Sequence, residues 1–167
     1  PDLTIDKLDS LSIEVSKKYK SIDTLFVDDS FLDSLNYGEG WMWDEGPWWY
    51  AAPISALSIN DNCINFYIEP GPLGQNATVN YFPKTSYINV LNNSVTVNDT
   101  LDFKKIRIDR DWVNSNNDFT IHGEIMDTTS IDTFYRNINN PTIFVGTIFK
   151  DLLKKNGSTI KHISTIS

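Results

Sequence analysis

The sequence predicts an α+β protein made of short-stranded β-sheets with a few flanking helices. Three observations predict this class: an amphipathic helical pattern near the start, a second one near the end, and many short segments of β-forming residues between them. Asn, Gly and Pro turns separate these segments. No internal sequence repeat is apparent.

The first twenty residues predict an amphipathic helix. Thr4 or Asp2 is placed to cap its start, and lysines gather in its last turn, where cations favour the helix dipole. A second helix is expected from about residue 142 to 155, with Pro141 in its first turn and Gly157 just past its end. The apolar faces consist of Leu8, Leu11, Val15 and Tyr19 in the first helix and Val145, Ile148, Phe149, Leu152 and Leu153 in the second.

The rest of the chain predicts strands and one long loop. Gly and Pro exclude regular structure from residues 31–53. We expect an insert domain of residues 1–60 and 105–167, with helix–strand units, and a small β-rich subdomain of residues 61–104. Strands are predicted at residues 22–27, 54–59, 63–69, 77–82, 86–91, 94–97, 104–109, 119–125 and 159–163.

Composition excludes several classes of function. The formal net charge is −8, from 22 acidic residues against 14 Lys and Arg, and no basic stripe interrupts it, so nucleic-acid binding is not expected. No apolar run approaches the roughly 20 residues that span a bilayer. Cys63 is the only cysteine and only two histidines are present, so we expect no disulfide, no metal site and no cofactor.

One segment stands out as a candidate binding site. Residues 41–50 hold four of the five tryptophans. Such rings often bury against a sheet and pin a long loop. Alternatively, a loop that combines several aromatic rings with acidic residues forms a platform for a ligand.

One stretch of the sequence is highly specific, Tyr50-Ala-Ala-Pro-Ile-Ser-Ala-Leu-Ser-Ile-Asn60. It resembles the class C low-molecular-mass penicillin-binding proteins, which are serine D-Ala-D-Ala carboxypeptidases and endopeptidases of the bacterial wall. The resemblance covers most of the chain in the family's order. Supporting matches are Val27-Asp-Asp-Ser30, Gly40-Trp-x-Trp-Asp44, Pro70-Gly71, Gly74-Gln75, Pro83-x-x-Ser86-Tyr87, Asn92, Ile108-x-Arg110, Ile121-His-Gly123 and Pro141…Phe149-x-x-Leu152…Asn156-Gly157.

The resemblance implies a non-catalytic region of such an enzyme. In that family a large insert interrupts the catalytic domain after the nucleophilic Ser-x-x-Lys motif and before Ser-x-Asn, with Lys-Thr-Gly later still. This chain matches the insert alone, so we expect it to lack the catalytic Ser-x-x-Lys and Lys-Thr-Gly motifs and to be inactive by itself. Short look-alikes are expected to be coincidental: Thr4-x-x-Lys7, Lys84-Thr-Ser86, Ser34-x-Asn36, Ser58-x-Asn60 and Ser115-x-Asn117.

The resemblance also implies a substrate and a location. The insert would frame the cleft in which the catalytic domain cleaves peptidoglycan stem peptides, outside the cytoplasm of a bacterium. We expect Asp44 to face a free amine of the substrate, while the rings of Trp41, Trp43 and Tyr50 cover its methylenes. The same rings could instead seal the joint between domains.

Two other readings remain open. The chain could be a stand-alone carbohydrate-binding module, in which exposed tryptophan rings stack on sugars. It could also be a degenerate homologue that kept the insert, lost the catalytic half and serves as a protein-binding domain. The direction of the rings and the flanking gene sequence separate these readings.

Overall fold

The fold is α+β, as the sequence predicts. The computed structural model describes residues 3–32, 35–41, 45–99 and 101–166. No helix among them is long and apolar enough to cross a membrane. The elements in chain order are α1 (Ile5–Lys18), β1 (Ser21–Asp28), the 3₁₀ turns η2 (Trp49–Ala51) and η3 (Asn60–Asn62), β2 (Cys63–Glu69), β3 (Thr78–Phe82), β4 (Asn89–Val97), β5 (Arg107–Arg110), β6 (Asp118–Met126), β7 (Asp132–Asn137), α2 (Pro141–Lys155) and β8 (Thr159–Ile166).

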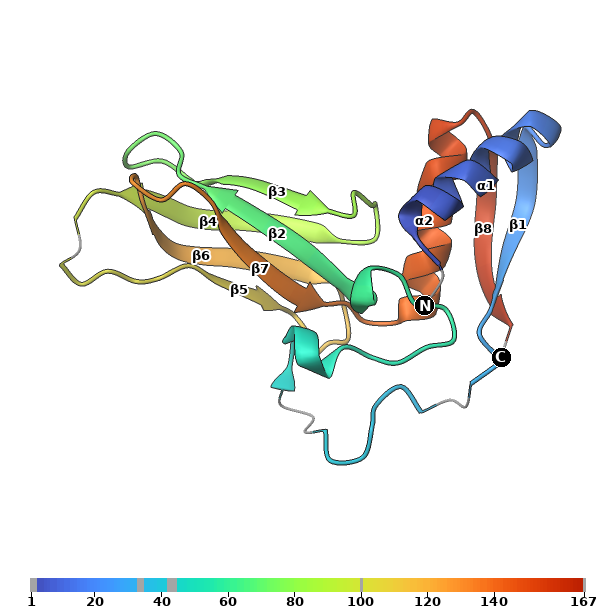
Figure 1. Ribbon diagram of the computed structural model, residues 1–167, viewed down its shortest axis with the longest axis horizontal. Coiled ribbons are helices and arrows are strands. Elements are labelled where there is room, and N and C mark those ends of the chain that lie inside the picture. The colour runs from blue at the N-terminus through green and yellow to red at the C-terminus, as the bar shows by residue number, and fades with distance from the viewer. Residues whose placement is uncertain (1–2, 33–34, 42–44, 100, 167) are drawn as a thin grey trace.

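The strands form three small sheets. The antiparallel sheet β3-β2-β7 and the mixed sheet β4-β6-β5 lie together at one end of the molecule, and the two helices lie at the other end beside the parallel pair β1-β8 (Figure 1). Residues 61–104 pair with strands outside that range, because β2 joins β7 and β4 joins β6. Both three-stranded sheets therefore combine strands from the two predicted subdomains, whose boundary stays a prediction.

The main core lies between the two three-stranded sheets. The β2 side chains Ile64, Phe66 and Ile68 are fully buried and alternate with outward-facing neighbours, as the period of a strand requires. From the other sheet, Phe119 places its ring centroid 5.2 Å from that of Phe66. Ile108 and other buried residues of β5 and β6 complete the same cluster.

The two helices begin where the sequence signals predict. The Thr4 hydroxyl accepts a hydrogen bond from the Lys7 amide at the start of α1. At the start of α2, the Asn140 side chain accepts one from Ile143. Gly146 lets α2 approach β1, because a β-carbon there would lie 2.8 Å from a methyl of Val27.

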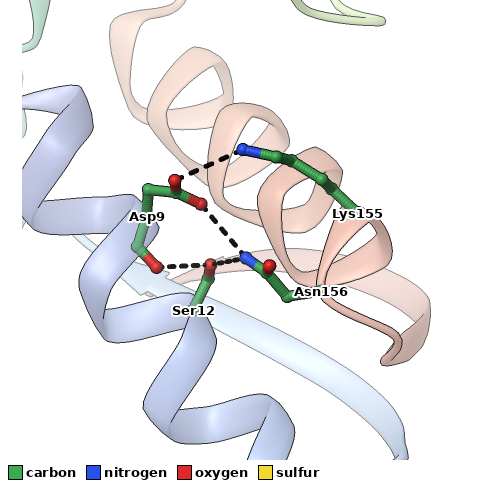
Figure 2. Close-up of polar contacts among 4 residues, drawn as sticks. All are labelled: Asp9, Ser12, Lys155 and Asn156. Atoms are coloured by element: carbon green, nitrogen blue, oxygen red, sulfur yellow. Dashed lines mark hydrogen bonds and ion pairs between the residues drawn. The ribbon is translucent and has the colours of Figure 1, made fainter.

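A polar cluster joins the two helices near the end of α2 (Figure 2). The Asp9 carboxylate accepts hydrogen bonds from Lys155 at 3.3 Å and from the Asn156 amide at 3.1 Å. The same amide also donates to the Ser12 hydroxyl at 2.7 Å, and that hydroxyl donates to the Asp9 backbone carbonyl. These bonds hold the pKa of Asp9 below its ordinary value of 3.8, with Asn156 contributing most and Lys155 next.

The lowered pKa of Asp9 predicts a small acid-sensitive contribution to stability. A depressed carboxyl pKa favours the folded state above the ordinary value, and this contribution is lost as the pH falls through the folded pKa. We expect Asp9→Asn to flatten the stability profile below about pH 4 and to lower stability by the same small amount throughout pH 6 to 8, where the wild-type contribution is fully present. Urea unfolding at several pH values measures this, and an unchanged acid limb would contradict it.

Three strand predictions differ from the structure. Residues 54–59 form bends rather than a strand, because the hydroxyls of Ser55 and Ser58 bond the local backbone. Residues 89–91 and 94–97 of the next two predicted strands belong to one continuous strand, β4, whereas residues 86–88 precede it. Strand β7 was not predicted at all, since Asp132, Arg136 and Asn137 weaken its β pattern.

Candidate functional site

The tryptophan-rich segment forms a loop fastened to the edge of strand β7. We call residues 36–54 the Trp loop; residues 42–44 within it lie outside the described part of the chain. Its two ends meet where the Ile54 amide donates to the Asn36 carbonyl at 2.7 Å. Trp48 forms an isolated antiparallel bridge with Arg136, and η2 follows directly.

Asn137, the last residue of β7, holds the Trp loop in place. Its side chain is 1% exposed, and its Nδ2 lies within 3.0 Å of the carbonyl oxygens of Gly46, Trp48 and Ala51. Its backbone amide donates to the carbonyl of Pro47 at 2.9 Å. One buried residue thus contacts four loop carbonyls with its three N–H groups, which fixes the path of residues 46–51.

Arg110 orients the Asn137 amide. Its guanidinium donates to Asn137 Oδ1 and to the Asn116 carbonyl, both at 2.9 Å. Because Oδ1 accepts from a cation, the NH₂ group of Asn137 must face the loop carbonyls. Burial lowers the pKa of Arg110, which nevertheless remains a cation at neutral pH.

Arg136 supports the loop from the other side. Its guanidinium carbon lies 4.5 Å from the centre of the Trp48 ring, a cation–π contact. Its Nε donates to the Ile108 carbonyl at 2.7 Å, and a terminal nitrogen donates to the Tyr135 carbonyl at 2.9 Å. Trp48 therefore rests on a cation that is itself held by the backbones of two strands.

A cavity of about 380 Å³ is lined by residues from both halves of the Trp loop. Arg110 lines it, and among the described residues its Nε is a buried nitrogen without a hydrogen-bond partner. The Trp112 ring forms one wall of the cavity and packs closely on Gly46. A β-carbon at Gly46 would lie 2.9 Å from Trp112 Nε1, and the φ of +59° at this residue also favours glycine. The other lining residues are Tyr37, Trp41, Ala51, Val113, Ser115 and Asn139.

Two of the four predicted substrate-binding residues are described by the structure. Trp41 lines the cavity, is 37% exposed and meets the Tyr37 ring edge-on at 6.2 Å. Tyr50 is 49% exposed and stacks on Trp48 at 6.3 Å, away from the described lining of the cavity. Trp43 and Asp44 lie outside the described residues. The role of all four in substrate binding stays a prediction.

Residues 1–166 match the model of the D-Ala-D-Ala carboxypeptidase 3 (S13) family. The chain belongs to this family. A curated member, the D-alanyl-D-alanine carboxypeptidase of Actinomadura sp. (strain R39), is 25% identical over an alignment of 169 positions, which covers 96% of this chain and 31% of that protein. The chain thus spans about a third of the length of this relative.

The fold of this S13 family member also matches solved structures. Penicillin binding protein 4 (dacB) from Haemophilus influenzae superposes with a TM-score of 0.73 and 20% identity, over 99% of this chain and 36% of that one. Its complex with a β-lactam superposes with a TM-score of 0.65 and 17% identity, over 100% of this chain and 35% of that one. These matches establish the same fold.

The sequence does contain one Ser-x-x-Lys pattern, Ser158-Thr-Ile-Lys161, but its side chains do not form a catalytic pair. The Ser158 hydroxyl is buried, donates to the Tyr19 carbonyl and is hydrogen-bonded to the Ser16 hydroxyl. Lys161 lies on β8 and pairs with Asp23 at 2.9 Å on the surface. A catalytic pair of this spacing needs a helix, where residues three apart share a face. Strand β8 does not provide that arrangement.

The other look-alike motifs in the described residues have structural roles. In Lys84-Thr-Ser86, the hydroxyls of Thr85 and Ser86 donate to the Asp151 carboxylate and fasten the turn between β3 and β4 to α2. No group of three or more His, Cys, Asp or Glu suited to a metal ion occurs in the described ranges. The thiol of Cys63 is buried, which raises its pKa to about 12 and leaves it protonated.

Sequence reasoning missed the residues that position the loop. Asn137 and Arg136 follow a segment that was not predicted to be a strand, and an Arg-Asn pair is no recognised signal for a loop anchor. Arg110 was noticed only as part of the pattern Ile108-x-Arg110. The burial of Arg110 would have pointed to this network, because arginine is rarely buried without partners, but burial is seen only in the structure.

Proposed function

We propose that this chain is the accessory, non-catalytic insert of a serine-type D-alanyl-D-alanine carboxypeptidase or endopeptidase that acts on peptidoglycan stem peptides. The observation that carries the proposal is the extent of the family match. It covers residues 1–166 of this chain but only about a third of the relatives' length. The remaining two thirds of such a relative are long enough to hold a separate catalytic domain.

In this proposal the parent enzyme hydrolyses the terminal D-Ala-D-Ala bond through a serine acyl-enzyme. The catalytic domain supplies the serine, its base and the oxyanion hole. This chain frames the cleft and binds the stem peptide beside the scissile bond, outside the cytoplasm. A rigid loop suits that task, because a positioning group costs less ordering entropy when its own backbone is already fixed.

The Trp loop supplies the contacts. Trp41 and Tyr50 present partly exposed rings from a loop that Asn137 fixes. We propose that these rings and Trp43 cover the methylenes of a stem-peptide side chain, while Asp44 pairs with its free amine. The cavity beside Trp41 provides room for such a side chain next to the loop.

Asp44→Ala in the complete enzyme tests this proposal. The expected result is a rise of about tenfold in KM for stem peptides that carry a free side-chain amine, with kcat little changed, because a uniform binding contact is removed. Asp127→Ala, an exposed acid in the turn after β6, is the matched control and should change neither constant. An equal rise in KM for peptides without that amine would contradict the proposal.

A binding module without a catalytic partner is the second candidate. The observation that favours it is the exposure of consecutive rings: Trp48 is 43%, Trp49 59% and Tyr50 49% exposed. Neighbouring aromatic rings with such large exposed fractions are typical of a surface that binds sugars or another protein. This reading also covers a homologue that has lost its catalytic half.

A further inference from the structure

The solvent-facing side of the sheet β3-β2-β7 carries a row of aromatic and amide side chains. Asn65 on β2 pairs with Phe82 on β3 and with Tyr135 on β7, so the three side chains lie in one line across the sheet. They project away from the core, because Phe66 next to Asn65 is fully buried. Phe82 is 42% and Tyr135 48% exposed, and strand spacing places them roughly 10 Å apart.

A hollow of about 370 Å³ adjoins this row. One wall is the ring of Trp49, which is 59% exposed. The other lining residues are Asn60, Asp61, Cys63, Asn65 and Tyr135. Trp49 and Tyr135 also line a second hollow of about 360 Å³. The two rings therefore form a ridge between neighbouring hollows. Neither ring lines the cavity beside Trp41.

The polar side of the hollow keeps hydrogen-bonding capacity for a ligand. Asn60 Nδ2 donates to the Cys63 carbonyl at 2.8 Å and to Asn65 Oδ1 at 3.0 Å. Within the part of the chain that the structure describes, this leaves Asn60 Oδ1 as an acceptor and the NH₂ group of Asn65 as a donor. The exposed Asp61 carboxylate adds a second acceptor.

The turn that presents these groups is held from below. Asn60, Asp61 and Asn62 all adopt left-handed backbone conformations, with φ near +50°. The buried Asn62 side chain donates to the Pro53 carbonyl at 2.8 Å and to Ser58 Oγ at 3.0 Å. The acceptors are therefore fixed before any ligand arrives, which lowers the entropic cost of binding.

We propose that this platform (Trp49, Asn60, Asp61, Asn65, Phe82 and Tyr135) binds the N-acetylhexosamine chain of peptidoglycan. A sugar ring offers an apolar C–H face to an aromatic ring and offers hydroxyl and acetamido groups, at its edge, to amides and carboxylates. The platform presents both kinds of group side by side. The stem peptides hang from this sugar chain, so the insert would hold the polymer at one site and the peptide at the Trp loop.

The charge of the first hollow disfavours an anionic polymer as its ligand. No Lys, Arg or His lines the first hollow in the described residues, and Asp61 faces it, so a phosphate-rich polymer is a poor fit. The amides also distinguish the platform from a purely apolar surface that would dock against another domain. The choice of polymer rests on the proposed function, whereas the chemistry of the platform does not.

The test is binding of a hexamer of β-1,4-linked N-acetylglucosamine to the 167-residue chain, measured by calorimetry and tryptophan fluorescence. We expect the wild-type chain to bind the hexamer, and Trp49→Ala and Asn65→Leu each to weaken binding by about tenfold or more. Tyr135→Thr should weaken it similarly while keeping a residue that favours strands. Phe31→Ala, which removes a ring that is 91% exposed elsewhere, should have no effect.

Two results would overturn the platform: no binding at millimolar hexamer, or equal binding by the wild type and all three variants. Thermal unfolding of each variant checks that lost binding does not reflect lost folding. A stem peptide without sugar serves as the second probe in the complete enzyme. If Asp44→Ala still raises KM while the hexamer fails to bind, only the platform is wrong; if the hexamer binds and Asp44→Ala has no effect, only the peptide contact is wrong.

Discussion

Replacing Asn137 with alanine is expected to lower the free energy of unfolding by about 3 kcal/mol and to release the Trp loop. The substitution removes the donor that three buried or partly buried loop carbonyls share. It also leaves an Arg110 nitrogen without its acceptor. Buried polar groups that lose their partners retain the full cost of desolvation, which is why a single amide has so large an effect.

Urea unfolding and tryptophan fluorescence measure the effect of Asn137→Ala. Fluorescence should shift toward longer wavelength in the folded state, since Trp48 would no longer be held against Arg136. Asn114→Ala is the matched control: its amide bonds only the exposed Asp111 carboxylate, so stability should change by less than about 0.5 kcal/mol. A loss as small in Asn137→Ala as in the control would show that the anchor contributes little.

Replacing Phe66 with alanine is expected to cost about 3–5 kcal/mol. Phe66 is fully buried between the two three-stranded sheets, with the Phe119 ring at 5.2 Å and the Tyr81 ring at 6.1 Å. Removing the ring loses its transfer free energy and leaves a cavity that two sheets cannot close. This change is a large fraction of the roughly 5–15 kcal/mol by which a typical domain is stable.

The matched control for Phe66→Ala is Phe31→Ala, because the Phe31 ring is 91% exposed and should contribute less than about 0.5 kcal/mol. Chemical denaturation followed by circular dichroism compares the two. If the two sheets pack on Phe66, the Phe66 variant unfolds at a much lower urea concentration, whereas the control has the same midpoint as the wild type. Equal midpoints would mean that the sheets do not pack on Phe66.

The parts of the fold that the sequence predicts well are those specified by local signals. The cap at Thr4, the first-turn Pro141 and the apolar face of α2 act within a few residues, and α1 and α2 lie where these signals place them. The same holds for β2 and β6, whose apolar residues alternate with outward-facing ones over their length. The predicted apolar face of α1 is wrong in part: Leu11 and Tyr19 are 51% and 49% exposed, while Ser12 and Ser16 are buried with Leu8.

The errors arise where long-range contacts decide the structure. The apolar residues of 54–59 resemble a strand, yet the side chains of Ser55, Ser58 and Asn62 satisfy the backbone there. In β7, the polar residues Arg136 and Asn137 are buried because their partners come from segments more than 25 residues away. No local pattern reports such partners.

The candidate site shows the same division. The cluster of rings in residues 41–50 was visible in the sequence, because four of the five tryptophans occur there. The anchor Asn137, the cation Arg110 and the cavity that Arg110 lines were not visible, because they depend on β5, β7 and the Trp loop meeting in space. The aromatic row on the outer sheet likewise depends on strand register, which single sequences specify weakly.

The account rests on the claim that this chain is an insert within a complete enzyme. Reading the source DNA on both sides of these 167 residues tests it most directly. The account predicts an open frame with a Ser-x-x-Lys motif upstream, then Ser-x-Asn and Lys-Thr-Gly downstream. Stop codons or unrelated sequence on either side would contradict it and would leave a binding protein that uses the Trp loop and the sheet platform alone.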